Sequence, residues 1–401
     1  MDRVLVLGAG VTGLSCAWRV ARHARVTMLD PAPGSGSSWV AGGMLAPVTE
    51  AWPGEEPLLD LGLASLERWP GFAAELDAIV DDGAGLRTEG TVVAATGAGD
   101  RAELDAVAGH LERLGRPVER LTGRELRRLE PALGPDVRGG LSVPGDLAVD
   151  NRMLLAALRR AVDAAGVTID RRAVAEVRDD GTRVVGVRLT DGTELAADAV
   201  VVATGAHSAA LHPALHGLVR PVKGEILRLA HRPGALPPPS RTVRALVDGR
   251  PVYLVPRGGG GLVLGATQYE AGFDTAPAVG GVRDLLRDAE RIVPGIAEFA
   301  LSEVAAGLRP GSPDNLPLVG RIGPEGLLAA TGHGRNGILL APVTADTVTA
   351  LLRGRPVPDV ARAADPTRLR PRERHVREDL SPERAVRAGE EEVTRARVDQ
   401  R

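Results

Sequence analysis

Short apolar runs flank one amphipathic stretch over the first thirty residues of the chain. Residues 3–7 (RVLVL) and 25–29 (RVTML) are apolar runs of strand length. Residues 14–23, between them, have the apolar spacing of a helix. This order predicts a strand–helix–strand unit at the N-terminus, with the two strands side by side and parallel.

Helical and strand-like patterns alternate through the rest of the chain. Residues 151–165 predict an amphipathic helix with Asp150 as its N-cap. Residues 167–203 alternate as strands joined by Asp-Gly turns. Further helices are expected near 55–80, 100–114, 122–130, 281–293 and 338–352, and further strands at 200–203, 221–229, 251–268 and 327–330.

A glycine-rich turn follows the first strand directly. Gly8, Gly10 and Gly13 form the pattern GxGxxG, and Asp30 stands seventeen residues later, at the end of the next strand. Glycines at this spacing allow a tight turn and close approach of a pyrophosphate to a helix start, while the acid accepts hydrogen bonds from a ribose. The unit therefore predicts nucleotide binding.

The segment after Asp30 favours FAD over NAD as the nucleotide. An NAD domain usually turns promptly into another helix, whereas residues 31–38 (PAPGSGSS) are a loop of small residues. Its hydroxyls and bare amides suit a second phosphate, and the apolar run 41–47 that follows suits the underside of an isoalloxazine ring. A simple surface loop is the alternative, and the apolar run argues against it.

The strand signals of the nucleotide domain fall in three separated blocks. We therefore predict an α/β (α+β) fold in which a discontinuous Rossmann-like domain is interleaved with a second domain built on an antiparallel sheet. The first domain is assigned residues 1–50, 140–220 and 300–357, and the second 51–139 and 221–299. Residues 358–401, dense in charge and proline, are expected to form a disordered or loosely helical tail.

Composition narrows the class of protein. The chain has 401 residues, 44% of them hydrophobic and 25% charged, as in soluble globular proteins. A net charge of −3 gives no reason to expect a nucleic-acid partner. No run reaches the roughly 18 apolar residues of a membrane span, and no signal peptide precedes the first strand, so a cytoplasmic location is expected.

Cysteine and histidine offer little chemistry. Cys16 is the only cysteine, which excludes an internal disulfide and a cysteine metal cluster, and it is expected to be a small buried residue of the first helix. His207, His212 and His216 lack a partnering acid or cysteine, so no metal site is expected.

Two arginines and a tyrosine stand in settings that suit an anionic ligand. Arg309, between glycine and proline, offers a fork that binds a carboxylate bidentately, with a structural salt bridge as the alternative. Arg335 lies in a glycine-rich turn before an apolar helix, where an anion is favoured. Tyr253 suits either a pocket wall with a carboxylate-binding hydroxyl or an ordinary core position. His333 is expected to orient the turn.

Several long segments resemble the FAD-dependent glycine oxidase family, often called ThiO, within the D-amino-acid oxidase-like flavoproteins. The resemblance covers residues 3–352 and implies a Rossmann-like domain with non-covalent FAD interleaved with an antiparallel-sheet substrate domain. The segments that carry it are VLVLGAGVTGLSCAW (4–18), AGGMLAP (41–47), VKGE (222–225), VYLVPR (252–257), GATQYEAGFD (265–274), GLRPGSPDNLPLVG (307–320) and GHGRNGILLAPVTA (332–345).

The resemblance gives roles to individual residues. Arg309 matches the arginine that clamps the substrate carboxylate, Tyr253 its tyrosine partner, and Arg335 a second arginine near the carboxylate and the flavin. Gly334 departs from relatives that often carry a larger residue there. The expected FAD contacts are Gly8, Gly10, Val11, Thr12, Gly13, Asp30, Pro31, Ser37, Ser38, Gly42, Gly43, Met44, Val174 (through its backbone, at the adenine), Gly205, His333, Gly334, Arg335, Asn336, Gly337, Ile338 and Leu339.

The resemblance also implies an activity. Glycine or a small amine, such as sarcosine or a small D-amino acid, would be oxidised to an imine or glyoxylate, with ammonia and hydrogen peroxide formed and molecular oxygen as acceptor. The product would serve the thiazole of thiamine, with a thiazole synthase as a candidate partner and a homo-oligomer as the expected assembly. Lys223 is a candidate for assisting oxygen. A D-amino-acid dehydrogenase, a sarcosine-type oxidase and a flavin module without glycine turnover remain alternatives.

Overall fold

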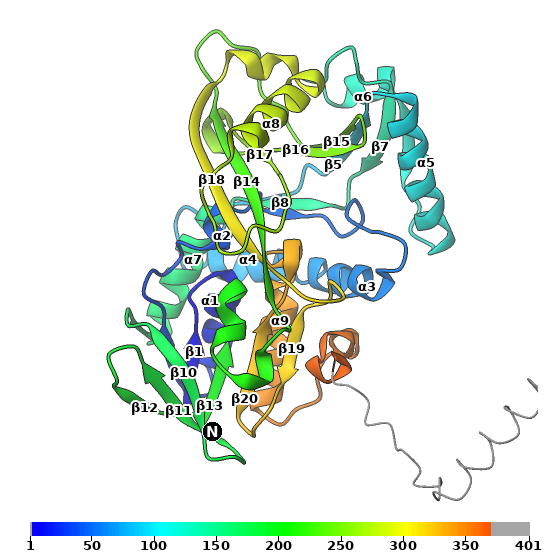
Figure 1. Cartoon of the computed structure of the whole chain (residues 1–401). Coiled ribbons are helices and arrows are strands. Elements are labelled where there is room, and N and C mark those ends of the chain that lie inside the picture. The colour runs from blue at the N-terminus through cyan, green and yellow to red at the C-terminus, as the bar shows by residue number, and fades with distance from the viewer. Residues whose placement is uncertain (1, 370–401) are drawn as a thin grey trace, which may run out of the picture. The chain divides into compact units, whose positions relative to one another are not determined.

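A six-stranded sheet collects short apolar strands from distant parts of the chain (Figure 1). The computed structural model describes residues 2–369. Five strands run parallel and one edge strand is antiparallel, in the order β19 (Leu318–Arg321), β20 (Leu327–Thr331), β13 (Ala199–Val202), β1 (Arg3–Leu7), β2 (Arg25–Leu29) and β9 (Thr168–Asp170). Parallel strands buried on both faces read as continuous apolar runs, which is why β1 and β2 were predicted to the residue.

Three helices pack together beside this sheet. Helix α1 (Val11–Val20) contacts both α7 (Asn151–Ala164) and α9 (Ala341–Leu352). Asp150 caps α7 as predicted, because its carboxylate accepts from the backbone N–H groups of the second and third helical residues at 2.9 and 3.2 Å. Cys16 is fully buried in this core, and burial raises the pKa of its thiol to about 12.

A small antiparallel sheet connects two strands of the larger one. It contains β10 (Val174–Asp179), β11 (Val184–Leu189) and β12 (Glu194–Ala196). Gly181 and Gly192 turn the chain between these strands with φ angles of 91° and 86°. The predicted Asp-Gly turns are therefore confirmed.

An eight-stranded sheet forms the other half of the described chain, at the top of Figure 1. All its neighbours pair antiparallel except β15 with β5. The order is β18 (Ala300–Gly311), β14 (Arg220–Ala230), β17 (Gly261–Gly265), β16 (Arg250–Pro256), β15 (Thr242–Val247), β5 (Thr91–Ala95), β7 (Gly139–Val143) and β6 (Glu119–Thr122).

Helices cover one end and one face of the eight-stranded sheet. Helix α8 (Val279–Ile292) buries Leu285, Ala289 and Ile292 in a core shared with β14, β16 and β17. Helix α6 (Gly123–Leu129) adds Leu126 to this core, whereas α5 (Ala98–Arg113) buries Leu104 in a separate cluster with Val93 and Leu141. The opposite face of β14, β16 and β17 packs against the segment around Met44, where Ile226, Val255 and Val263 form a separate small core with Val40 and Met44.

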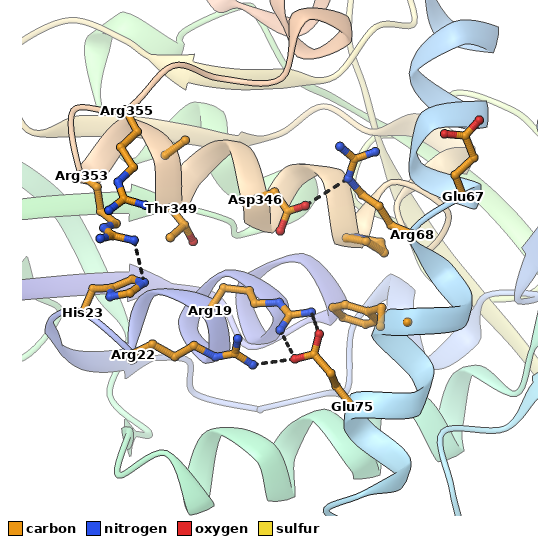
Figure 2. Close-up of a pocket in the computed structure, with 14 residues that line it drawn as sticks. Arg19, Arg22, His23, Glu67, Arg68, Glu75, Asp346, Thr349, Arg353 and Arg355 are labelled. Carbon is orange, nitrogen blue, oxygen red and sulfur yellow. Dashed lines mark hydrogen bonds and ion pairs between the residues drawn. The ribbon is translucent and has the colours of Figure 1, made fainter.

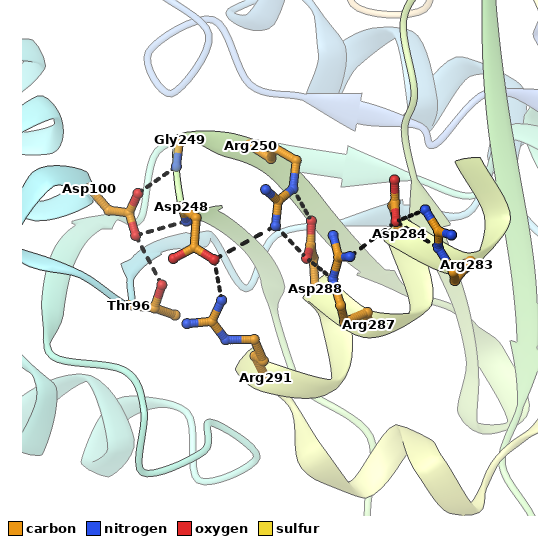
Figure 3. Close-up of polar contacts among 10 residues, drawn as sticks. All are labelled: Thr96, Asp100, Asp248, Gly249, Arg250, Arg283, Asp284, Arg287, Asp288 and Arg291. Atoms are coloured by element: carbon orange, nitrogen blue, oxygen red, sulfur yellow. Dashed lines mark hydrogen bonds and ion pairs between the residues drawn. The ribbon is translucent and has the colours of Figure 1, made fainter. Parts of the chain in front are cut away.

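A polar network fixes the tip of the β15–β16 hairpin between α5 and α8 (Figure 3). Asp100 on α5 accepts from the backbone N–H groups of Asp248 and Gly249 at 3.2 and 2.8 Å. Arg250 pairs with Asp288 on α8 at 2.8 Å, and Arg291 with Asp248 at 2.6 Å. Burial opposes ionisation of Asp100, but the hydrogen bonds outweigh it and lower the pKa of this carboxyl.

The residues that pack with each of the two large sheets do not change over at residues 51 and 300, where the domain boundaries were predicted. Helices α3 (Glu56–Leu66) and α4 (Trp69–Asp77) pack in the core of the six-stranded sheet, where Phe72 meets Trp18 edge-on at 5.4 Å. Strand β18 belongs to the eight-stranded sheet because it pairs with β14 from Ala300 to Gly311. Residues Met1–Arg368 form one compact unit.

Three short strands lie where the two large sheets approach each other. They are β3 (Met44–Leu45), β8 (Leu147–Val149) and β4 (Leu86–Arg87), with β8 in the middle. The four-residue helix α2 (Ser37–Val40) precedes β3. The chain that follows β2 therefore passes directly from the six-stranded sheet towards the eight-stranded one.

The last described residues are more ordered than predicted. Residues 359–369 form the 3-10 helices η6 (Asp359–Ala364) and η7 (Pro366–Leu369), with Ala361 and Ala364 buried and Arg368 bound to Asp314 at 2.8 and 2.9 Å. The expectation of a loose tail does not hold for these residues, because small apolar side chains and one ion pair anchor them. Residues 370–401 lie outside the described part of the chain. No helix within residues 2–369 has the length and apolar character needed to cross a membrane.

Candidate functional site

The glycine turn between β1 and α1 is as tight as its spacing predicts. Gly8 has a φ of 96°, and a methyl carbon built on it would lie 2.5 Å from the carbonyl oxygen of Ala203. A methyl carbon on Gly13 would lie 1.9 Å from the Gly8 oxygen. Both positions exclude a side chain, because the first glycine packs against the end of β13 and the third packs α1 onto β1.

The start of α1 offers backbone donors to an anion. Gly10 provides no side-chain cap, and the first turn of α1 contains no acidic residue. Ser38 Oγ accepts from the Val11 N–H at 3.0 Å, so the loop after β2 reaches this helix start. A phosphate fits there, because the first N–H groups of a helix lack partners within the helix and carry partial positive charge.

Asp30 stands at the end of β2, as predicted, and its carboxylate holds two backbone groups. It accepts from the Ala9 N–H at 2.6 Å and from the Ala32 N–H at 2.8 Å. These bonds tie the glycine turn to the loop of small residues. A carboxylate has about four acceptor positions, so the predicted ribose contact is compatible with them and stays a prediction.

Residues 41–44 form a tight crossing between the two large sheets. A methyl carbon on Gly42 would lie 2.8 Å from Tyr253 Cε2, and one on Gly43, whose φ is 77°, would lie 2.1 Å from the Val149 oxygen. Met44 pairs with Ala148 in the short sheet. A simple surface loop is therefore excluded, since this segment is packed on both sides.

Arg257 holds this crossing, and sequence reasoning missed it. Its guanidinium is 6% exposed, donates to the Gly42 oxygen at 2.6 Å and lies 3.4 Å from the carboxylate of Asp150. Burial lowers the pKa of Arg257 to about 10. The sequence offered one signal for this residue, namely an arginine that directly follows an apolar strand ending in proline.

Tyr253 and Arg309 lie on the face of the eight-stranded sheet opposite helix α8. The ring of Tyr253 packs between Gly42 and Gly265. A methyl carbon built on Gly265 would lie 2.5 Å from the hydroxyl oxygen of Tyr253. Desolvation raises the pKa of Tyr253, and Arg309 opposes that rise, so the two side chains are electrostatic neighbours. The hydroxyl is therefore protonated near neutral pH and can donate a hydrogen bond.

The Arg309 guanidinium lies over Gly224 of the adjacent strand. A methyl carbon there would be 2.2 Å from Arg309 Nη1, which donates to the Thr267 oxygen at 3.2 Å. Within residues 2–369, no carboxylate oxygen comes within 4.0 Å of this guanidinium. The salt-bridge alternative is thus not realised there, and most of the donors of Arg309 are left for a ligand.

Glu50 is a second residue that sequence reasoning missed. Its carboxylate binds Arg244 of β15 at 2.6 Å and Arg335 at 3.2 Å, and its side chain is 13% exposed. Burial raises the pKa of Glu50, but Arg244, Arg335 and Arg309 outweigh burial and lower it. An ionised carboxylate therefore sits beside the Arg309–Tyr253 pair.

Arg335 has carboxylate partners where Arg309 has none. Besides Glu50, it pairs with Glu55 at 3.2 Å, and it donates to the Glu50 carbonyl oxygen at 3.0 Å. These contacts hold the turn η5 (Gly334–Asn336) against the segment after β3. The predicted contact of Arg335 with a substrate carboxylate stays a prediction.

His333 and Gly334 shape the same turn. His333 is buried, its Nε2 lies 3.0 Å from Thr344 Oγ1, and burial lowers its pKa to about 4, so it orients the turn as a neutral ring. Gly334 has a φ of 54° with no atom within 4 Å of an added methyl carbon. Helix α9 begins at Ala341, three residues later than predicted, because η5 and the residues after it intervene.

The remaining predicted residues lie at the edges of the same region. Val174 begins β10, and Gly205, with a φ of 57°, begins the turn after β13, where its oxygen accepts from Ser208 and Thr331. Lys223 is buried and pairs with Asp274 and the Ala276 oxygen. Its part in oxygen chemistry stays a prediction. The other expected contacts are Thr12, Pro31, Ser37, Asn336, Gly337, Ile338 and Leu339.

A glycine turn typical of dinucleotide binding, joined by a packed crossing to the sheet face that carries Tyr253 and Arg309, fits a flavin-dependent oxidoreductase. The family model described as FAD dependent oxidoreductase, DAO, matches residues 3–351, and the chain belongs to this family. FAD is therefore its cofactor. The glycine turn, the open helix start and the Gly42–Gly43 crossing fit such a group.

Individual relatives agree with this assignment. The chain is 35% identical to the glycine oxidase of Geobacillus kaustophilus over 357 residues, covering 87% of this chain and 92% of that protein. The crystal structure of glycine oxidase from Geobacillus kaustophilus superposes with a TM-score of 0.83, covering 92% of this chain and 99% of that one. The crystal structure of iminodiacetate oxidase from Chelativorans sp. BNC1 gives a TM-score of 0.80 at 28% identity, covering 91% of this chain and 99% of that one.

One of the relatives is considerably longer than this chain. The chain is 32% identical to the bifunctional protein ThiO/ThiG of Synechocystis sp. over 370 residues, which cover 91% of this chain but only 54% of that protein. The chain thus spans about half the length of this bifunctional relative.

Proposed function

We propose that this protein oxidises glycine, or an amine of similar size, at its α carbon. The glycine oxidases among its relatives support the reaction. One observation carries the substrate class: among residues 2–369, Arg309 has no carboxylate partner, and its guanidinium lies on the face where Tyr253 packs against Gly42. A small α-amino carboxylate is the ligand that such a pair accommodates.

Arg309 and Tyr253 hold the substrate in this proposal. The guanidinium binds the carboxylate bidentately, and the Tyr253 hydroxyl donates to one of its oxygens. Hydrogen bonds to charged groups contribute about 1.5–3 kcal/mol each, so this clamp can dominate the binding of so small a molecule. FAD, when bound, supplies the two-electron oxidation of the carbon–nitrogen bond.

No side chain is assigned as a catalytic base. Glu50 is engaged by two arginines that lower its pKa, and His333 is bonded to Thr344, so neither is suited to accept a proton from the substrate. The substrate amine then enters as the neutral form, and the role of the protein is to position the α carbon.

The product and partners follow from the same proposal. The imine hydrolyses to glyoxylate and ammonia or enters thiazole synthesis for thiamine, with a thiazole synthase as partner. The bifunctional ThiO/ThiG relatives support this partner. Molecular oxygen as acceptor, with hydrogen peroxide formed, a cytoplasmic location and a homo-oligomeric assembly complete the proposal.

An anaerobic titration of the FAD-loaded protein tests it. Glycine is expected to bleach the yellow flavin absorbance, and air is expected to restore it with release of peroxide. Bleaching without peroxide would indicate a dehydrogenase, and preferential bleaching by sarcosine a sarcosine-type oxidase. A spectrum unchanged by glycine, sarcosine and D-alanine would contradict amine oxidation altogether.

A further inference from the structure

A cleft of about 570 Å³ lies between α1, α4 and α9 (Figure 2). It is lined by the last turn of α1, by α4 and by α9 from Pro342 to Ala350, rather than by the glycine turn or the Arg309 face. Its walls are unusually rich in charge for a protein whose net charge is −3. The charged residues that line it are Arg19, Arg22, Arg68, Arg353 and Arg355 against Glu67, Glu75 and Asp346, which leaves an excess of two positive charges.

The carboxylates of the cleft neutralise only one part of it. Arg19 and Arg22 share the single carboxylate of Glu75, and Arg68 binds Asp346 at 3.1 Å. Two arginines therefore depend on one acid. One positive charge therefore remains there, and the rest of the excess lies elsewhere along the walls.

It lies around Arg353 and Arg355, at the end of α9. In the described part of the chain, neither guanidinium has a carboxylate oxygen within 4.0 Å. Arg353 Nη1 donates to His23 Nε2 at 3.1 Å instead. Partial desolvation and the charges of Arg353, Arg355 and Arg22 all lower the pKa of His23, as expected beside uncompensated cations.

We propose that this cleft is a binding site for a phosphate group, carried by a small organic ester or as free phosphate. An excess of two positive charges matches a phosphate dianion. Guanidinium forks bind phosphate oxygens bidentately, and the cleft has the size of small-molecule sites. The phosphate is held by Arg353 and Arg355, whereas Arg22 keeps its ion pair with Glu75 (Figure 2), and the ring of Phe72 lines the same cleft.

The position of the cleft links it to the cofactor region. Helix α1 begins directly after the glycine turn, and α9 begins after the turn that carries Arg335. Arg353, just after α9, already contacts His23, just after α1, so a phosphate on Arg353 binds where the far ends of these two helices meet. Binding is therefore expected to raise the melting temperature of the FAD-loaded protein.

Calorimetric titration of the full-length, FAD-loaded protein tests the site. The probes are inorganic phosphate and glycerol 3-phosphate, at fixed ionic strength in chloride. Saturable binding is expected, and the double variant Arg353→Gln/Arg355→Gln should weaken it by about tenfold or more, since each lost bond to a charged group is substantial. Arg362→Gln is the matched control, because Arg362 lies on the surface with Asp359 as its partner.

The relative affinities of the two probes identify the ligand, and the absence of binding overturns the proposal. Tighter binding of the ester identifies an organic phosphate as the ligand, and equal binding identifies free phosphate. Absence of saturation by both probes at millimolar concentration overturns the proposal, as does unchanged affinity in the double variant. If the double variant loses its flavin spectrum, Arg355→Gln alone repeats the test, with the same decrease in affinity expected and the same overturning result.

Discussion

The ring of Tyr253 packs against the backbone of Gly42 so closely that a methyl carbon on Gly42 would lie 2.8 Å from its Cε2 atom. This contact joins the segment that follows the dinucleotide turn to the sheet that carries Arg309. It requires a residue without a side chain at position 42, and it fixes where the tyrosine hydroxyl points. The cofactor region and the substrate face are therefore built as one site.

Gly42→Ala is expected to displace Tyr253 and weaken substrate binding. Overpacking costs about 1–3 kcal/mol, so the KM for glycine should rise about tenfold if that cost falls on the bound state. Steady-state peroxide assays measure it. Gly99→Ala, at a helical position with no atom within 4 Å of the added carbon, is the control. An unchanged KM in Gly42→Ala would mean that Tyr253 does not position the substrate.

Glu50→Gln is expected to shift the choice of substrate towards dicarboxylates. Glu50 binds both Arg244 and Arg335, and Arg335 keeps Glu55 as a second partner, so the loss of Glu50 leaves Arg244 without a carboxylate partner in the described residues and available for a second substrate carboxylate. The ratio of kcat/KM for iminodiacetate to that for glycine should rise about tenfold or more. Glu89→Gln, at a surface ion pair, should leave the ratio unchanged. A ratio unaltered in Glu50→Gln would refute this role.

His333 makes stability depend on pH. Folding lowers its pKa from 6.5 to about 4, so the folded state binds this proton less readily than the unfolded state. Above pH 6.5 His333 is neutral in both states and leaves the free energy of unfolding unchanged. As the pH falls from 6.5 towards 4, protonation of His333 in the unfolded state lowers the free energy of unfolding. Over that interval the wild type should lose about 3 kcal/mol more than His333→Gln, which does not titrate. Urea unfolding at several pH values measures it, and identical pH profiles would be inconsistent with a buried neutral ring.

Asp100→Ala is expected to lower stability without changing catalysis. Its buried carboxylate accepts from the N–H groups of Asp248 and Gly249 at the exposed hairpin tip, and hydrogen bonds to charged groups contribute about 1.5–3 kcal/mol each. The melting temperature should fall by several degrees, while the KM for glycine stays unchanged. Asp105→Ala, at a more exposed ion pair, is the control. An equal effect of both variants would mean that the hairpin bonds contribute little.

The elements that were predicted well depend on local signals. The β1–α1–β2 unit follows from two apolar runs and the spacing of three glycines, and α7 follows from its periodicity and the Asp150 cap. These features are encoded within about twenty neighbouring residues, so no distant contact was needed to recognise them.

The parts that were missed depend on distant contacts. Strand β18 contains glycine and proline and lacks a clear alternation, and it is held by pairing with β14, far earlier in the chain. Glu50 meets Arg244 and Arg335, which lie 194 and 285 residues away. Arg257 binds the Gly42 oxygen across 215 residues. No local pattern marks such partners.

The central claim is that Arg309 clamps the substrate carboxylate, and the kinetics of Arg309→Ala test it most directly. The KM for glycine should rise about a hundredfold or more, because two charge-assisted hydrogen bonds are lost, while the FAD content stays that of the wild type. Arg188→Ala, on the exposed side of β11, should behave like the wild type. A KM for glycine in Arg309→Ala equal to that of the wild type would contradict the account.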